Sequence, residues 1–179
     1  MFNEIFIDLD PNSFVLSSIV QPFSINALIA FIPTVICLFV SAFVSASEVA
    51  FFSLSPKDFE RMESENHSSD EKIKLLLQKP EHLLATILIT NNLVNVSIIV
   101  LSSYIINQTL NFSAFPILGF IFETVLITFI ILLVSEIMPK TFAQQHGLRM
   151  ARFGAGILKS LRSILKPFVW ILVSSRSEE

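Results

Sequence analysis

The sequence predicts an all-α integral membrane protein, with three transmembrane helices and further juxtamembrane helices that form a belt at one membrane surface. Hydrophobic residues make up 53% of the 179 residues, and the mean hydropathy is +0.69. Three apolar blocks, at 25–52, 83–106 and 114–138, are each longer than the ~20 residues that a helix needs to cross a bilayer. Every lysine and arginine lies outside these blocks.

The distribution of basic residues predicts how the helices are oriented. Five of the 12 lysines and arginines lie in the loop 53–82, and the other seven follow the third block. Basic residues favour the cytoplasmic side, so the N-terminus is expected outside and the C-terminus in the cytoplasm. Residues 1–24 then form an outer N-terminal segment, and residues 25–146 form the transmembrane domain.

The cytoplasmic loop between the first two blocks is predicted to be helical. Ser55 is a suitable N-cap, with Pro56 at the first helical position and Asp58 in the first turn. A second short amphipathic helix is expected to end near Pro80. In the first transmembrane helix, Pro33 predicts a kink or a local break.

Residues 147–173 are predicted to form a basic amphipathic juxtamembrane helix. Five basic side chains fall within one arc of this helix: Arg149, Arg152, Lys159, Arg162 and Lys166. Such a helix suits the anionic headgroups of a lipid bilayer, or it packs on the other cytoplasmic helices, and both can hold. The tail, 174–179, reads as cut off before the remainder of a longer protein.

The residues that enzymes use for chemistry form no recognisable pattern in this sequence. It contains no Gly-rich phosphate loop, no Cys/His metal cluster and no nucleophilic triad pattern. The protein is therefore not expected to be an enzyme. Its basic residues follow a membrane surface, so nucleic acid is not an expected partner.

Each apolar block contains polar residues, which are costly in hydrocarbon and are for that reason candidate functional sites. Ser41 and Ser45 in the first block, and Asn91 and Asn95 in the second, are four residues apart and so share a helix face. Glu136 lies near the end of the third block. Further candidates for accessory or pathway roles are Ser47, Glu48, Thr90, Asn92 and Glu123.

Less specific interpretations of the same residues stay open. Serine pairs also let helices approach closely, and packing and cation binding explain Ser41 and Ser45 equally well. The asparagines could instead form an interhelical hydrogen-bond cluster. Glu48 and Glu136 lie near the cytoplasmic boundary, where an acid can reach water.

The end of the third block combines a carboxylate with a proline. Pro139 has no N–H for the carbonyl four residues earlier, that of Ser135, and it predicts a helix break beside Glu136. A free carbonyl next to a carboxylate can coordinate a cation. With oxygens from serine and asparagine of the other two helices, the shell would contain oxygen alone, which suits Mg²⁺ better than Zn²⁺.

Three motifs, "SASEVAFFSLS", "LLATILITNNLVN" and "SEIMPKTFA", resemble the signatures of the transmembrane domain of the CorC/cyclin M family, which is implicated in magnesium and cobalt transport. The resemblance runs from about Phe31 to Arg149. It implies a homodimer in the bacterial inner membrane, with the N-terminus outside. It also implies a cytoplasmic pair of CBS modules in the full-length protein.

The family's cation site, carried onto this chain residue by residue, comprises six positions: Ser41, Ser45, Asn91, Asn95, Ser135 and Glu136. Pro139 matches the family's helix breaker. Two positions depart from the family pattern, because Ser135 and Thr90 stand where glycine is usual. The added side chain of Ser135 would either narrow the pocket or supply another oxygen.

The leading hypothesis is a membrane transporter of divalent cations, Mg²⁺ or Co²⁺, and the resemblance implies export driven by sodium entry. The alternative is a non-transporting membrane scaffold of the same family, in which the polar clusters hold helices or subunits together. The chain is also rich in phenylalanine, with 18 residues, and in asparagine and serine. This composition resembles a branch of the family associated with gliding motility, for which a scaffold role would fit.

Overall fold

The computed structural model describes residues 24–112 and 115–170, and the chain there is built of helices. Among these described residues, three helices are long and apolar enough to cross a membrane, which confirms the predicted class of all-α integral membrane protein. Their bounds are Ile25–Phe52 for α2, Pro80–Thr109 for α5 and Pro116–Gln145 for the third, which has three parts. The expected tail, 174–179, and all but Ser24 of the expected segment 1–24 lie outside the described residues.

The third transmembrane helix changes its winding partway along. Its first part is α6 (Pro116–Ile130), followed by the π-helical stretch η1 (Ile131–Ile137) and by α7 (Met138–Gln145). The helix therefore extends seven residues beyond the predicted end at 138. In α2, by contrast, the helix continues on both sides of Pro33 as one element.

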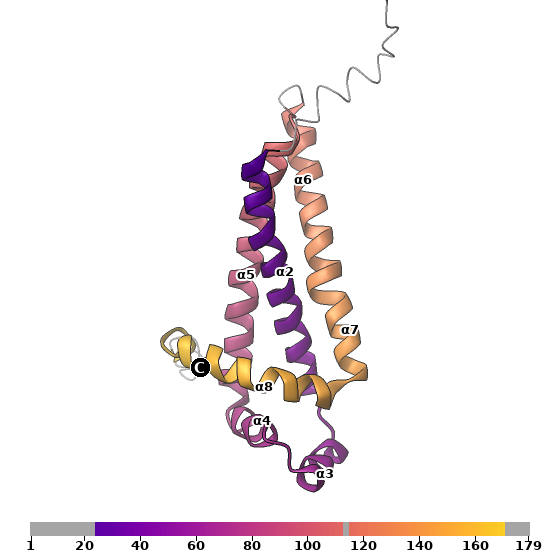
Figure 1. Ribbon diagram of the computed structural model, residues 1–179, viewed down its shortest axis with the longest axis vertical. Coiled ribbons are helices and arrows are strands. Elements are labelled where there is room, and N and C mark those ends of the chain that lie inside the picture. The colour runs from indigo at the N-terminus through magenta and orange to yellow at the C-terminus, as the bar shows by residue number, and fades with distance from the viewer. Residues whose placement is uncertain (1–23, 113–114, 171–179) are drawn as a thin grey trace, which may run out of the picture.

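The central helix of the molecule is α2. It packs along α5 over most of its length, and it also contacts η1, α7 and the juxtamembrane helix α8 (Gly147–Ile164) (Figure 1). In the most apolar 18-residue stretch of each helix, 28% of the residues are buried in α2 and in α5, but only 17% are buried in the third helix. The third helix thus presents most of its apolar surface to its surroundings.

Short helices gather at one end of the transmembrane helices, where α8 lies across their ends (Figure 1). The first is α3 (Pro56–Glu65), and its predicted start is confirmed: Ser55 is the N-cap, and Asp58 accepts hydrogen bonds from the Ser55 N–H and Oγ at 2.9 and 2.6 Å. The second is α4 (Asp70–Leu77), which ends before Pro80 as predicted.

The largest apolar core lies where α2, α5 and α8 meet. It contains small and branched side chains that are almost fully buried: Val44, Ala50, Leu83, Ile87, Ala151, Ala155 and Leu158. Gly154 of α8 lies against α2, since a Cβ atom added there would be 3.0 Å from Ser47 Oγ. This core fixes α8 beside the end of α2, and it leaves the basic side chains of α8 outside the core.

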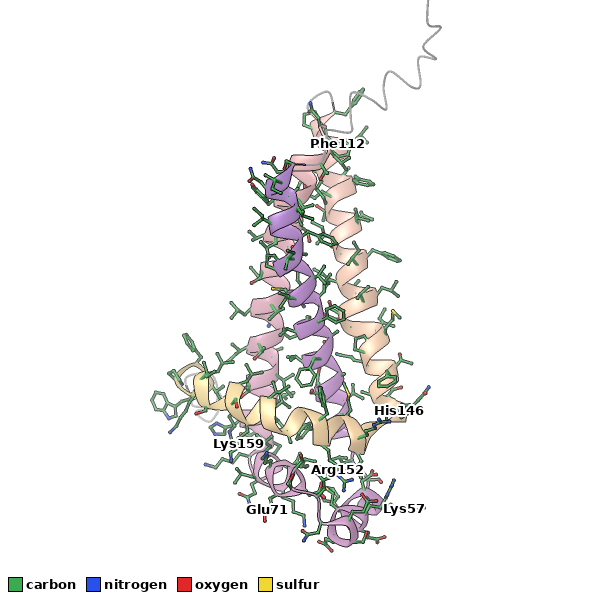
Figure 2. All side chains as sticks on the ribbon, viewed as in Figure 1. Lys57, Glu71, Phe112, His146, Arg152 and Lys159 are labelled. Atoms are coloured by element: carbon green, nitrogen blue, oxygen red, sulfur yellow. The ribbon has the colours of Figure 1, made fainter. Side chains whose placement is uncertain are left out.

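An ion-pair network joins α8 to the two short helices. Arg152 donates to both carboxylate oxygens of Asp70, from Nε at 2.8 Å and Nη2 at 3.0 Å, and to Glu65 from Nη1 at 2.6 Å. Figure 2 shows Arg152 on the side of α8 that faces α3 and α4. We call Arg152, Asp70 and Glu65 the Arg152 network.

The charges of the Arg152 network shift one another's proton affinities. Burial alone would raise the pKa of Asp70, but hydrogen bonds from Arg152 and from the His67 N–H outweigh burial and hold that pKa below its ordinary value. The hydrogen bond from Arg152 lowers the pKa of Glu65. In return, the hydrogen bonds to Asp70 and Glu65 raise the pKa of Arg152. All three groups are therefore charged at neutral pH, and each positive or negative charge has an opposite partner.

Candidate cation site

A cluster of polar side chains lies between the transmembrane helices, and Ser41 of α2 is at its centre. Ser41 is fully buried, and its Oγ lies 2.8 Å from Asn91 Oδ1 and 2.7 Å from Asn95 Oδ1, both on α5. The helical spacing of four residues explains this arrangement, because it places both asparagines on the same face of α5. We call Ser41, Asn91, Asn95 and Glu136 the oxygen cluster.

The oxygen cluster holds more acceptors than donors at its centre. A serine hydroxyl has one proton, so Ser41 can donate fully to only one of the two amide oxygens that approach it. The second oxygen then faces the hydroxyl oxygen without a proton between them. Two amide oxygens that compete for the one proton of the Ser41 hydroxyl form an electronegative centre that a cation would stabilise.

Glu136 connects this centre to the third transmembrane helix. Asn95 Nδ2 donates to Glu136 Oε1 over 3.4 Å, a long hydrogen bond. Turning the Asn95 amide over would place its oxygen against the carboxylate, so Glu136 favours the orientation in which Asn95 Oδ1 points to Ser41. The cluster therefore draws on α2, α5 and η1, as the sequence predicted that all three helices would contribute.

The helix around Glu136 departs from α-helical winding, although not where the sequence predicted. The helix was expected to break at Pro139, but it continues through this residue to Gln145. The irregularity lies one turn earlier, in η1, where the Met138 N–H donates to the Leu133 carbonyl five residues back. A wider turn accommodates the residue that lacks an N–H, and π-helical turns of this kind are frequent at functional sites.

Two further predicted residues are buried without a hydrogen-bond partner among the described residues. Ser45 lies one turn after Ser41 on α2, and Ser135 immediately precedes Glu136 in η1. Both are 0% exposed, and the Oγ atom of each makes no hydrogen bond within the described part of the chain. A buried hydroxyl without a partner costs free energy, and such groups mark sites where a water or an ion can bind.

Most of the predicted accessory residues have other contacts. Ser47 donates to the Phe43 carbonyl at 2.8 Å and lies beside α8, and Thr90 donates to the Thr86 carbonyl at 2.7 Å. Asn92 is exposed on α5.

Glu48 and Glu123, the two acids predicted in accessory or pathway roles, lie in different surroundings. Glu48 forms an ion pair with Lys140 Nζ at 3.2 Å, and so it is not a free carboxylate for a cation. Glu123 is half-buried on α6 and lines a separate cavity of about 360 Å³ with Asn107 and Asn111. It is therefore not one of the groups that the hydrogen bonds join to Ser41.

The sequence did not predict Lys140 as the partner of Glu48, nor the π-helical turn. Lys140 stands in the motif "SEIMPK", but its partner is 92 residues away in the sequence, and only the packing of α7 on α2 brings them together. The π-helical turn lies within η1, and the largely apolar sequence before Ser135 has no helical periodicity whose change could reveal a wider turn.

The donor set determines which ligands the site could take. The oxygen cluster has one carboxylate, and no group of three or more His, Cys, Asp or Glu side chains suited to a metal exists within the described residues. A hard cation that keeps part of its water shell and takes amide, hydroxyl and carboxylate oxygens fits this set. Soft metal ions, which prefer sulfur or imidazole, do not.

These features define a class: an integral membrane protein with three transmembrane helices around a polar site built from all of them. The family comparison then gives the assignment. A family model of the cyclin M transmembrane N-terminal domain matches residues 32–176, and the chain belongs to this family. The predicted resemblance is thereby confirmed.

Two curated relatives are similar over most of this chain. A UPF0053 protein of Haemophilus influenzae is 38% identical over 142 residues, which cover 79% of this chain and 33% of the relative. The UPF0053 inner membrane protein YfjD of Escherichia coli is 31% identical over 133 residues, covering 74% of this chain and 30% of the relative. The chain thus matches about a third of the length of each.

Proposed function

We propose that this chain is the membrane domain of a divalent-cation transporter and that it carries Mg²⁺ through the oxygen cluster. The observation that supports this most is the meeting of Ser41, Asn91 and Asn95 with the carboxylate of Glu136 inside the membrane. Polar groups cost free energy in hydrocarbon, and a cluster with an excess of acceptors costs more than a satisfied one. Binding of a cation repays that cost.

The chemistry of Mg²⁺ agrees with a site of this composition. Mg²⁺ prefers six oxygen ligands and gives up its water reluctantly, so proteins often hold it through one or two carboxylates and several waters. In the proposed site Glu136 supplies the charge, and Ser41, Asn91 and Asn95 replace water. Ser45 and Ser135, whose hydroxyls lack a partner within the described residues, are the further ligands. Co²⁺ has a similar size and would compete.

We further propose the orientation and surroundings that the sequence predicts. The N-terminus is outside, and the end with α3, α4 and α8 faces the cytoplasm. The membrane is a bacterial inner membrane, which agrees with the name of the Escherichia coli relative as an inner membrane protein. The chain functions as a homodimer, and the longer relatives leave room for a cytoplasmic regulatory part such as a pair of CBS modules. Export driven by sodium entry is the transport mode that follows from the family resemblance.

The purified chain tests the proposed site through Mg²⁺ titration by calorimetry. Asn91→Ala removes an oxygen of the cluster, and Asn92→Ala makes the same change at the next residue, which is exposed. We expect Asn91→Ala to weaken Mg²⁺ binding about tenfold or more and Asn92→Ala to leave it unchanged. Equal affinities for the wild type and both variants would remove the proposed site.

The scaffold alternative gives a different result in a thermal melt. If the oxygen cluster only holds helices together, Asn91→Ala lowers the melting temperature and Mg²⁺ has no effect on the wild type. If the cluster binds Mg²⁺, millimolar Mg²⁺ raises the melting temperature of the wild type, because a ligand that binds only the folded state stabilises it. The same Mg²⁺ should then fail to stabilise Asn91→Ala.

A further inference from the structure

We propose that the groove between α4, the start of α5 and the far end of α8 binds one anionic glycerophospholipid. The groove has a volume of about 890 Å³. This lies within the range of roughly 300–1,000 Å³ that is usual for ligand pockets in proteins. The site is separate from the oxygen cluster, so this inference does not depend on cation transport.

The rim of the groove is positively charged. Four basic side chains line it: Lys79 from the turn before α5, and Lys159, Arg162 and Lys166 from the end of α8. No aspartate or glutamate is among the lining residues, and none of the four basic side chains forms an ion pair with another described residue. Figure 2 shows Lys159 where α8 crosses the start of α5.

The groove combines this basic rim with an apolar interior. Leu76 of α4 is 0% exposed and Val169 is 1% exposed, so both form its floor. Leu75 and Trp170 contribute apolar surface at its edges, with 45% and 65% of their surfaces exposed. Helical residues 166–170, which follow α8, carry both the last basic side chain of the rim and the tryptophan.

The position of the groove selects a lipid as its occupant. It lies beside Pro80, where the transmembrane helix α5 begins, and so it is at the level of the lipid headgroups. A headgroup phosphate would contact the lysines and arginine, while the start of an acyl chain would lie along the leucines, the valine and the tryptophan. Basic pockets at this level are typical sites for anionic headgroups, and tryptophan favours the same interface.

This site differs from the general attraction of a basic helix to an anionic surface. Arg149 is on the same helix and is exposed, but it lies near Arg61 and Ser69, away from the groove. General attraction would depend on Arg149 as much as on Lys159 or Arg162. A discrete site depends only on the cations at its rim.

The single tryptophan of the chain makes the site measurable. Trp170 lines the groove, so a lipid bound there with bromine atoms on its acyl chains would quench the tryptophan fluorescence. The chain is reconstituted in nanodiscs of phosphatidylcholine that contain either brominated phosphatidylglycerol or brominated phosphatidylcholine at matched mole fractions. The variants are Lys159→Gln, Arg162→Gln and the double variant, with Arg149→Gln as the control of equal charge change on α8.

We expect the anionic brominated lipid to quench at a lower mole fraction than the zwitterionic lipid. Each rim cation removed should raise the half-quenching mole fraction of the anionic lipid by about fivefold, and Arg149→Gln should leave it unchanged. Circular dichroism and gel filtration confirm that each variant is folded.

Three results would overturn the proposal. The first is equal quenching of the wild type by the two lipids, and the second is an equal effect of Arg149→Gln and Lys159→Gln. The third is full relief of quenching by added inorganic phosphate, which would mean that the groove binds a free phosphate group rather than a lipid.

Discussion

Two polar clusters in this protein each join three helical elements, and they differ in how their charges are satisfied. In the Arg152 network, which joins α8 to α3 and α4, a guanidinium forms three hydrogen bonds with two carboxylates. In the oxygen cluster, between the transmembrane helices, two amide oxygens share one hydroxyl proton and a single carboxylate receives one long hydrogen bond. The first cluster is internally complete and the second is not.

We propose that this difference separates a structural role from a binding role. A complete network of opposite charges gains nothing from another ion, and its removal should affect stability alone. An incomplete cluster of oxygens gains most when a cation arrives, so changes there should affect binding more than stability. The following predictions test this separation.

The largest effect is expected at Glu136, the one carboxylate of the oxygen cluster. Glu136→Gln keeps the shape of the side chain and removes its charge, and we expect the Mg²⁺ dissociation constant to rise about 100-fold. Calorimetric titration measures it. Glu123→Gln makes the same change on α6 beside the other cavity and should shift the constant little. An equal loss in both variants would mean that overall charge, not the cluster, governs binding.

The second effect concerns stability and should appear in the Arg152 network. Arg152→Ala leaves the carboxylate of Asp70, which is only 4% exposed, without its main partner. A buried charge left unpaired in this way lowers the free energy of unfolding by about 1–3 kcal/mol or more. A lower melting temperature with an unchanged Mg²⁺ affinity is expected. Arg149→Ala is the control on the same helix, and a similar drop in melting temperature there would argue against the network.

The third effect is a pH dependence of the same network. The pKa of Asp70 is below its ordinary value of 3.8 in the folded chain. The ionised Asp70 therefore contributes its full stabilisation of the fold at pH values above its ordinary pKa. This contribution is lost as the pH falls through the lower pKa that Asp70 has in the folded chain. Between about pH 5 and about pH 3, the melting temperature of the wild type should fall more steeply than that of Arg152→Ala. Parallel curves would show that Arg152 does not hold these carboxylates charged.

The smallest effect is expected at Ser45, whose buried hydroxyl makes no hydrogen bond within the described residues. Ser45→Ala removes an unsatisfied polar group, so without Mg²⁺ the melting temperature should stay the same or rise slightly. With Mg²⁺ the gain in melting temperature should be smaller than in the wild type. If the variant gains as much as the wild type, Ser45 is a packing residue rather than a ligand.

Much of this arrangement could be predicted because it depends on local sequence. The apolar blocks around 25–52 and 83–106 gave two transmembrane helices, and the spacing of Asn91 and Asn95 placed them together on one helix face. Ser55 and Asp58 gave the start of α3 in the same way. Helix length, facing and capping are set by residues within a few positions of one another, so a single sequence contains that information.

The features that escaped prediction depend on contacts between distant residues or on small changes of winding. Arg152 and Asp70 are 82 residues apart, and only the packing of α8 on α4 brings them together. Ser47 is only two residues after the predicted ligand Ser45, yet its hydroxyl donates to the Phe43 carbonyl of its own helix, next to Gly154. Which of several nearby hydroxyls faces a site depends on how the helices are rotated, and the sequence does not show this directly.

The most direct test of the central claim is to locate the ion itself. Mn²⁺ takes the same oxygen ligands as Mg²⁺ and scatters X-rays anomalously, so crystals grown with Mn²⁺ reveal its position. We expect an anomalous peak between α2, α5 and η1, about 2.1 Å from a carboxylate oxygen of Glu136 and close to Ser41 and Asn91. The absence of a peak there, with Mn²⁺ bound only at surface acids such as Glu63 of α3, would contradict the account.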